Sequence, residues 1–71
     1  MLFSERLRGL RKSAKVSQTV LANAIGLNIK QIQRYEAGNN EPTLSVLISL
    51  ADFFDVSLDY LVGRSDRRER G

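Results

Sequence analysis

The stretch at residues 18–35, "QTVLANAIGLNIKQIQRY", decides the fold of this chain. Its apolar residues are spaced mostly by three and four, the spacing of a helix that buries one face. Gly26 interrupts the pattern, and glycine readily adopts the left-handed conformation in which many helices end. We therefore predict two short helices joined by a tight turn at Gly26, a helix-turn-helix arrangement. Ala22 lies near the expected crossing of the two helices, where a larger side chain would push them apart.

Residues that favour helix ends surround both predicted helices. Ser17 precedes the first helix and Asn28 precedes the second, and both side chains can accept hydrogen bonds from the free N–H groups of a first helical turn. The second helix is expected to end at Gly38. Ile32 and Tyr35 are expected to hold this helix to the core, which leaves a roughly opposite face of amide and cationic groups.

The same signals predict three further helices. A first helix begins near Phe3, and a fourth helix is capped by Thr43. A short fifth helix is capped by Ser57 and ends at Gly63. The expected fold is therefore all-α, with five short helices in one domain over residues 1–63. The side chains expected in its core are Leu7, Leu10, Leu21, Ala22, Ile25, Ile32, Tyr35, Leu44, Leu47, Ala51, Phe54, Val56 and Leu61.

The last eight residues, 64–71, read "RSDRRERG" and contain no apolar side chain. A segment without apolar side chains cannot bury enough surface to become ordered by itself. We therefore expect a flexible, charged tail or linker. The 71 residues of the chain leave room for one domain only.

The composition excludes several classes of function. The sequence has no histidine and no cysteine, which removes disulfides, the usual zinc sites, and catalysis by Ser-His-Asp or Cys-His groups. Asp52 and Asp55 lie three residues apart and are interpreted as a solvated helix face. We expect no enzymatic activity, no metal and no cofactor.

No apolar run reaches the roughly 18 residues that cross a bilayer, and the start of the chain does not resemble a secretion signal, so a cytoplasmic setting is expected.

Charge is unevenly distributed along the chain. Residues 1–35 carry seven cations and one anion, whereas residues 36–63 carry five anions and no cation. Such segregation makes one end of a molecule attractive to polyanions and repels them from the other. Chance clustering explains the charge distribution equally well when charge is considered alone.

The sequence "VSQTVLANAIGLNIKQIQRYEAGNNEPTLSVLISLADFFDVSLDYLVG" resembles the helix-turn-helix domains of phage repressors, the Cro/C1-type or XRE family. The resemblance rests on "SQ" at the start of the second helix, on "YEAG" at the end of the third, and on "VSLDYLVG", in this order and with matching gaps. It covers residues 3–63. It implies a five-helix, lambda-repressor-like fold that inserts its third helix into the major groove of double-stranded DNA. It also implies a bacterial or phage-encoded transcriptional repressor that acts at the nucleoid, as a homodimer on a palindromic operator.

The resemblance assigns base reading to the third helix. Arginine and lysine can donate to guanine, glutamine can pair with adenine, and isoleucine can contact a thymine methyl group. Ile29 departs from the polar residues common at its position, so it either meets a base or covers the edge of the core. The expected base-reading residues are Ile29, Lys30, Gln33 and Arg34, with Gln18 from the second helix.

The resemblance also implies phosphate contacts at helix starts and in the loop after the third helix. The free N–H groups and the dipole of a helix start favour an anion. Asn39 and Asn40 are neutral where relatives often carry basic residues, which should reduce the salt dependence of binding. The expected phosphate contacts are Lys15, Ser17, Gln18, Asn28, Asn39 and Asn40.

Two further assignments come from the resemblance. Arg11 and Glu36 are expected to form an ion pair between the first and third helices, outside the DNA-reading face. Leu58, Tyr60 and Val62 are expected to form a dimer patch, or else to close the bottom of the core.

A second class of function remains open at this point. The chain fits an antitoxin or another protein-interaction module of the same fold. Retention of one protein partner without DNA would favour that class, whereas steeply salt-dependent binding to a palindromic duplex would favour a DNA-binding regulator.

Overall fold

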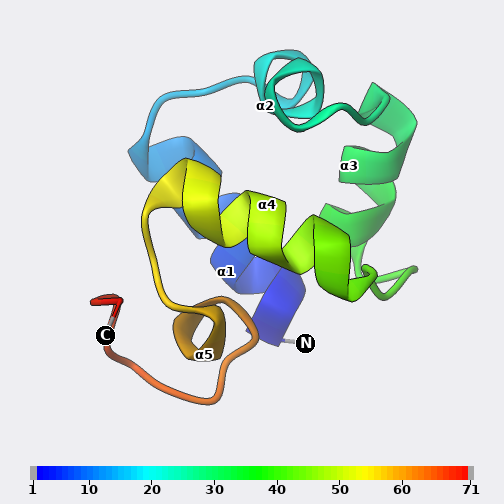
Figure 1. Cartoon of the computed structure of the whole chain (residues 1–71). Coiled ribbons are helices and arrows are strands. Elements are labelled where there is room, and N and C mark those ends of the chain that lie inside the picture. The colour runs from blue at the N-terminus through cyan, green and yellow to red at the C-terminus, as the bar shows by residue number, and fades with distance from the viewer. Residues whose placement is uncertain (1, 71) are drawn as a thin grey trace.

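The computed structural model describes residues 2–70, which form five helices and no strand (Figure 1). Helix α1 runs through the centre of the molecule behind α4, with α2 above it, α3 to one side and α5 below (Figure 1). The predicted all-α fold of five short helices is confirmed. No helix in the described part of the chain is long and apolar enough to cross a bilayer. The helices are α1 (Leu2–Ser13), α2 (Gln18–Ile25), α3 (Ile29–Ala37), α4 (Leu44–Phe54) and α5 (Leu58–Leu61).

Short polar side chains start the helices as the sequence predicts. Ser17 Oγ accepts a hydrogen bond from the Val20 N–H at 3.0 Å, and Ser57 Oγ accepts one from the Tyr60 N–H at the same distance. Thr43 caps α4 in the same way. These bonds satisfy donors that have no partner within the helix itself, so the local sequence is sufficient to place each helix start.

Two glycines end the helix-turn-helix elements in the left-handed conformation. Gly26 follows α2 with φ 76°, and Gly38 follows α3 with φ 79°. In both cases the glycine N–H donates to carbonyl groups of the last helical turn. Two residues other than glycine also adopt this conformation, Lys15 with φ 58° after α1 and Asp55 with φ 54° after α4.

The core lies where α1, α3 and the inner faces of the other helices meet. Phe3 and Tyr35 pack edge to face with ring centroids 6.3 Å apart, which joins the start of α1 to α3. Ile25, Leu47 and Phe54 are only partly buried and pack against this core. Its buried apolar residues are Phe3, Leu7, Leu10, Leu21, Ala22, Ile32, Tyr35, Leu50, Ala51, Val56 and Leu61.

The predicted core was wrong at one end of α4. Leu44 was expected inside, but it is 66% exposed, whereas Leu50 is fully buried. Leu44 is the first residue of α4 and lies on nearly the same side as Ala51, seven residues further along. The fully buried residues Leu50 and Ala51 lie in the second half of the helix, so the exposure of Leu44 follows from its place at the end of the helix and not from the side that it faces.

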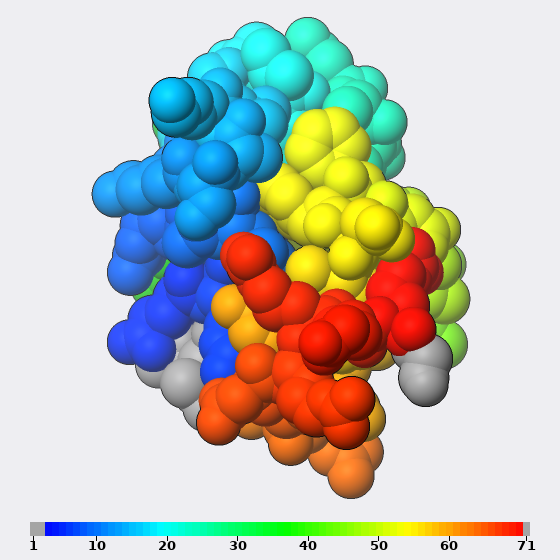
Figure 2. Space-filling model, turned by 90° about the vertical axis from the view of Figure 1, so that its left-hand side faces the viewer, coloured from blue at the N-terminus to red at the C-terminus, as the bar shows by residue number. Residues whose placement is uncertain are grey.

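The charged segment after α5 lies against the helices and has no helix or strand of its own. Figure 2 shows it crossing the face between α1 and the end of α4. The Ser57 N–H donates to the Arg68 carbonyl at 2.9 Å, and Ser57 Oγ donates to the Arg67 carbonyl at 3.2 Å. Arg70 pairs with Asp52 at the end of α4. Residues 64–70 therefore make specific contacts with the domain, and we call them the tail.

Candidate nucleic-acid interface

One face of α3 gathers cationic and amide side chains. Lys30, Gln33 and Arg34 are exposed, and together with Ala37 and Asn39 they line a shallow hollow on the surface. No acidic side chain is among the residues that line it. The face is therefore rich in hydrogen-bond donors and positive in charge, which suits an anionic ligand.

The opposite side of α3 holds this face in place. Ile32 is completely buried and Tyr35 nearly so. Because these two side chains are fixed in the core, the helix cannot rotate without opening it. The exposed donors of α3 are thus presented by a rigid element.

Ile29 lies at the edge of this face. It is the first residue of α3 and is 37% exposed, and it is not among the residues that line the hollow. Val20 of α2 is also exposed. The helix pair therefore offers apolar as well as polar surface.

The start of α3 is closed by a reciprocal pair of side-chain hydrogen bonds. The Gln31 N–H donates to Asn28 Oδ1 at 2.9 Å, and the Asn28 N–H donates to Gln31 Oε1 at 3.1 Å. Such a capping box satisfies two free donors at once. Ser17 Oγ accepts a single hydrogen bond at the start of α2. Asn28 and Ser17, two of the predicted phosphate contacts, therefore also cap helices.

The structure separates the two asparagines of the loop after α3. Asn39 lines the hollow with Lys30 and Arg34, whereas Asn40 lines a different recess with Glu41 and Pro42. Lys15 is exposed in the turn between α1 and α2.

Arg11, Glu36 and Gln18 form one hydrogen-bonded cluster behind this face. Arg11 Nε and Glu36 Oε2 are 2.5 Å apart, and Arg11 Nη2 donates to Glu36 Oε1 at 3.0 Å. Gln18 Nε2 also donates to Glu36 Oε1, at 3.2 Å. The hydrogen bond to Glu36 raises the pKa of Arg11 above its ordinary value. Arg11 Nη1 further donates to the Val16 carbonyl, so this cluster fixes α1, α2 and α3 relative to one another.

Two arginines of α1 have roles that the sequence did not indicate. Arg8 donates to the Glu36 main-chain carbonyl at 2.8 Å, near the end of α3. Arg6 donates to the carbonyls of Tyr60 and Ser65, each at 3.0 Å. These bonds join residues 28 to 59 positions apart, and no local sequence pattern predicts such contacts.

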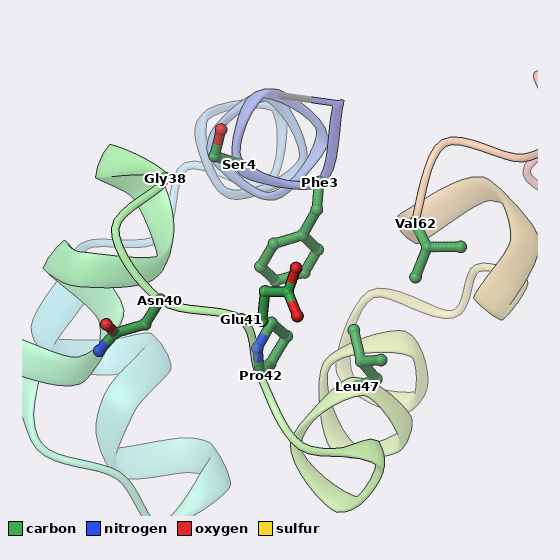
Figure 3. A pocket seen from close by; sticks show the side chains of 8 residues that line it. All are labelled: Phe3, Ser4, Gly38, Asn40, Glu41, Pro42, Leu47 and Val62. Carbon is green, nitrogen blue, oxygen red and sulfur yellow. The ribbon is translucent and has the colours of Figure 1, made fainter.

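The three residues of the predicted dimer patch lie in different surroundings. Val62 lines a recess of about 460 Å³ into which Phe3 of α1 and Leu47 of α4 also project (Figure 3). Leu58 is exposed on α5. Tyr60 is half-buried, and its ring lies 3.9 Å from the Arg6 guanidinium and 5.5 Å from that of Arg68. The Tyr60 ring is therefore largely engaged within its own chain.

A short helix pair with a glycine turn, whose second helix is exposed on a donor-rich face, defines the helix-turn-helix class. A family model described as "Helix-turn-helix" matches residues 7–61. The chain belongs to this family, in its Cro/C1-type (XRE) group.

Two relatives in sequence are regulators by name. The chain is 40% identical over 65 residues to the uncharacterized HTH-type transcriptional regulator YobD of Bacillus subtilis (strain 168), covering 92% of this chain and 58% of that protein. It is 36% identical over 64 residues to the cryptic phage CTXphi transcriptional repressor RstR of Vibrio cholerae, covering 90% and 57%. The chain thus spans less than three-fifths of the length of these relatives.

A solved structure resembles the whole domain. It is the crystal structure of the P22 c2 repressor protein in complex with a synthetic operator, with a TM-score of 0.85 and 31% sequence identity. The match covers 92% of this chain and 98% of that one.

Proposed function

We propose that this protein binds double-stranded DNA at specific sequences and regulates transcription. The observation that carries the proposal is the hollow on α3, where Lys30, Gln33, Arg34 and Asn39 present donors and no acid. A helix about 10 to 12 Å across fits the major groove of B-form DNA, which is about 12 Å wide. The relatives named as regulators and the operator complex of the P22 c2 repressor support the same conclusion.

Base reading is assigned to the exposed side of α3. Lys30 and Arg34 would donate to guanine O6 and N7, and Gln33 would pair with adenine or bind the backbone. Ile29 would meet a thymine methyl group at the edge of the same face. Each good bidentate contact is worth about 1–3 kcal/mol of discrimination between bases.

Phosphate binding is assigned to the helix starts and the flanking loops. The cap residues Ser17 and Asn28 and the first residue of α2, Gln18, lie where free N–H groups favour an anion. Lys15 would add the one full positive charge of this group. The asparagines 39 and 40 would contact the backbone without adding charge, so the salt dependence should be moderate.

We further propose that the protein is a repressor that acts as a homodimer on a two-fold symmetric operator at the nucleoid. RstR is named a repressor, and the P22 c2 repressor was solved on an operator, which supports this reading. The second copy would be held through Leu58, Tyr60 and Val62, where Leu58 is exposed and Val62 borders the recess (Figure 3). Two half-sites about 34 Å apart would then be bound together.

Selection of bound sequences from a random duplex pool tests DNA binding directly. We expect a palindromic consensus whose half-sites are one helical turn apart. Recovery of no enriched sequence, together with co-purification of a single protein partner, would instead favour a protein-interaction module.

On the selected duplex, Arg34→Ala is expected to weaken binding by roughly 1–3 kcal/mol and to relax the preference at one base pair. Lys15→Ala is expected to weaken binding to all sequences similarly, because a phosphate contact carries no sequence information. Arg67→Ala provides a matched loss of one positive charge in the tail and should leave operator affinity unchanged. The affinity of the three variants for the selected duplex is measured by fluorescence anisotropy. Full affinity of both Arg34→Ala and Lys15→Ala would show that the DNA face is assigned wrongly.

A further inference from the structure

Gln18 and Glu36 connect the two outer ends of the helix-turn-helix pair. Gln18 is the first residue of α2, and Glu36 lies one residue before the end of α3. Gln18 Nε2 donates to Glu36 Oε1 at 3.2 Å, across 18 positions of sequence. Glu36 is 5% exposed, so the acceptor of this bond is fixed in the interior.

The chemistry of Glu36 determines which end of the Gln18 amide faces inward. An ionised carboxylate only accepts hydrogen bonds, whereas a glutamine amide has a donor end and an acceptor end. Arg11 Nη2 also donates to Glu36 Oε1, so this oxygen accepts from two donors. The NH₂ end of Gln18 must therefore face Glu36, and rotation of the amide by 180° would place two oxygens against each other.

The Gln18 nitrogen keeps a second N–H after this bond is made. An amide NH₂ carries two donors, and one of them is directed to Glu36. Gln18 is half-buried, so part of the residue remains exposed to solvent. The second donor belongs to the first residue of α2, where the helix dipole also favours an anion.

We propose that Glu36 is a positioning residue for DNA binding, which orients the Gln18 amide so that its second N–H donates to a DNA phosphate. The proposal rests on the proposed function and adds to it a role for a buried acid that does not touch DNA. Arg11 holds the Glu36 carboxylate in place through two bonds, and Arg8 holds the main chain of the same residue. Glu36 then acts on DNA only through Gln18.

A double-mutant cycle tests this coupling. Gln18→Ala, Glu36→Ala and the double variant are compared for affinity to the selected duplex, at a temperature where circular dichroism shows each to be folded. We expect each single variant to weaken binding roughly tenfold, as for loss of one hydrogen bond to a charged group. We expect the double variant to bind no more weakly than Glu36→Ala alone, since Gln18 acts only when Glu36 orients it.

Arg8→Ala is the matched control. It removes a cation that bonds only the Glu36 main-chain carbonyl and leaves both donors of the carboxylate, so Gln18→Ala should still weaken binding roughly tenfold on the Arg8→Ala background. If the effects of Gln18→Ala and Glu36→Ala instead multiply, or if Arg8→Ala abolishes the effect of Gln18→Ala as Glu36→Ala does, Glu36 has a structural role only. If the unaltered protein binds no duplex, the proposed function itself fails, which is a separate result.

A spectroscopic measurement covers the case in which Glu36→Ala does not fold. In the unaltered protein, one of the two side-chain protons of Gln18 is expected to exchange slowly with solvent because it is bonded to Glu36, and the other is expected to exchange faster. Addition of the duplex should shift the faster-exchanging proton strongly and change the other little, because only the former is free for phosphate. Two protons that exchange equally fast before DNA is added, or no shift afterwards, would overturn the proposal.

Discussion

Lys15 combines a charge that suits DNA with a backbone conformation that suits glycine. It follows α1 with φ 58°, and its N–H donates to the Lys12 carbonyl at 3.0 Å. The next N–H, of Val16, donates to the Arg11 carbonyl at 3.1 Å. This arrangement ends the helix as a glycine would, but a side chain in the left-handed region costs roughly 1–2 kcal/mol. The residue thus carries strain at a position where we propose a phosphate contact.

Two substitutions at this position separate strain from charge. Lys15→Ala and Lys15→Gly both remove the positive charge, but only glycine relieves the left-handed strain. We expect the glycine variant to be more stable than the alanine variant by about 1 kcal/mol in urea unfolding. Both should lose the same DNA affinity, and both should reduce the slope of log K against log salt by about 0.9. Equal stability of the two variants would mean that the turn is not strained at Lys15.

At the scale of elements, the turn between α2 and α3 depends on the backbone of Gly26 rather than on space around it. Gly26 has φ 76°, and an added Cβ would meet no atom within 4 Å. Gly26→Ala is therefore expected to destabilise the domain by about 1 kcal/mol through backbone strain alone. Gly9 lies within α1, also with open space around it, and Gly9→Ala should stabilise by about 0.8–1 kcal/mol because alanine favours helices. Thermal unfolding followed by circular dichroism should shift in opposite directions for the two variants.

The helices themselves were predictable because residues close to each helix end determine where the helix begins or stops. The cap at Ser17 and the glycine at Gly26 involve bonds over three or four positions, which a local pattern can show. The exposure of Leu44 was not predictable, because helical spacing shows which side of α4 faces inward but not how far along the helix the core extends.

The candidate site was predictable only in part from the sequence. Opposite faces of α3 follow from helical spacing, since Ile32 is buried and Arg34 is exposed. Pairing of Arg11 with Glu36 came from resemblance to a family, because the residues are 25 positions apart and nothing local joins them. The bond from Gln18 to Glu36 was missed, because it depends on how three helices meet and on which end of an amide turns inward.

At the scale of the whole molecule, charge is arranged so that the acidic end is partly covered by the chain itself. Arg70 contacts both Asp52 and Asp55 near the end of α4, and its hydrogen bond with Asp52 raises its pKa above the ordinary value. The tail runs along this face (Figure 2), away from the hollow on α3. Within residues 2–70, no acidic side chain forms an ion pair with Lys30 or Arg34 of α3.

Arg6 joins the start of the tail to the rest of the domain. Its side chain is 18% exposed, donates to the Tyr60 and Ser65 carbonyls and to Asp66 Oδ1, and lies over the Tyr60 ring. Hydrogen bonds from a charged group contribute roughly 1.5–3 kcal/mol, and a partly buried cation over an aromatic ring contributes about 1 kcal/mol more. Arg6→Ala is therefore expected to lower the free energy of unfolding by roughly 2–3 kcal/mol in urea titration.

The amide of Ser57 reports whether the tail has been released. It donates to the Arg68 carbonyl, so its hydrogen exchange should accelerate in Arg6→Ala, whereas the Gln31 amide, whose exposed bond at the start of α3 opens locally, should keep its rate. Arg67→Ala is the matched control, because Arg67 is 83% exposed and lies 3.7 Å from Glu69, a surface pair worth at most about 1 kcal/mol. If Arg6→Ala destabilises the protein no more than Arg67→Ala, or if the Ser57 amide exchanges at its original rate, then Arg6 does not hold the tail in place.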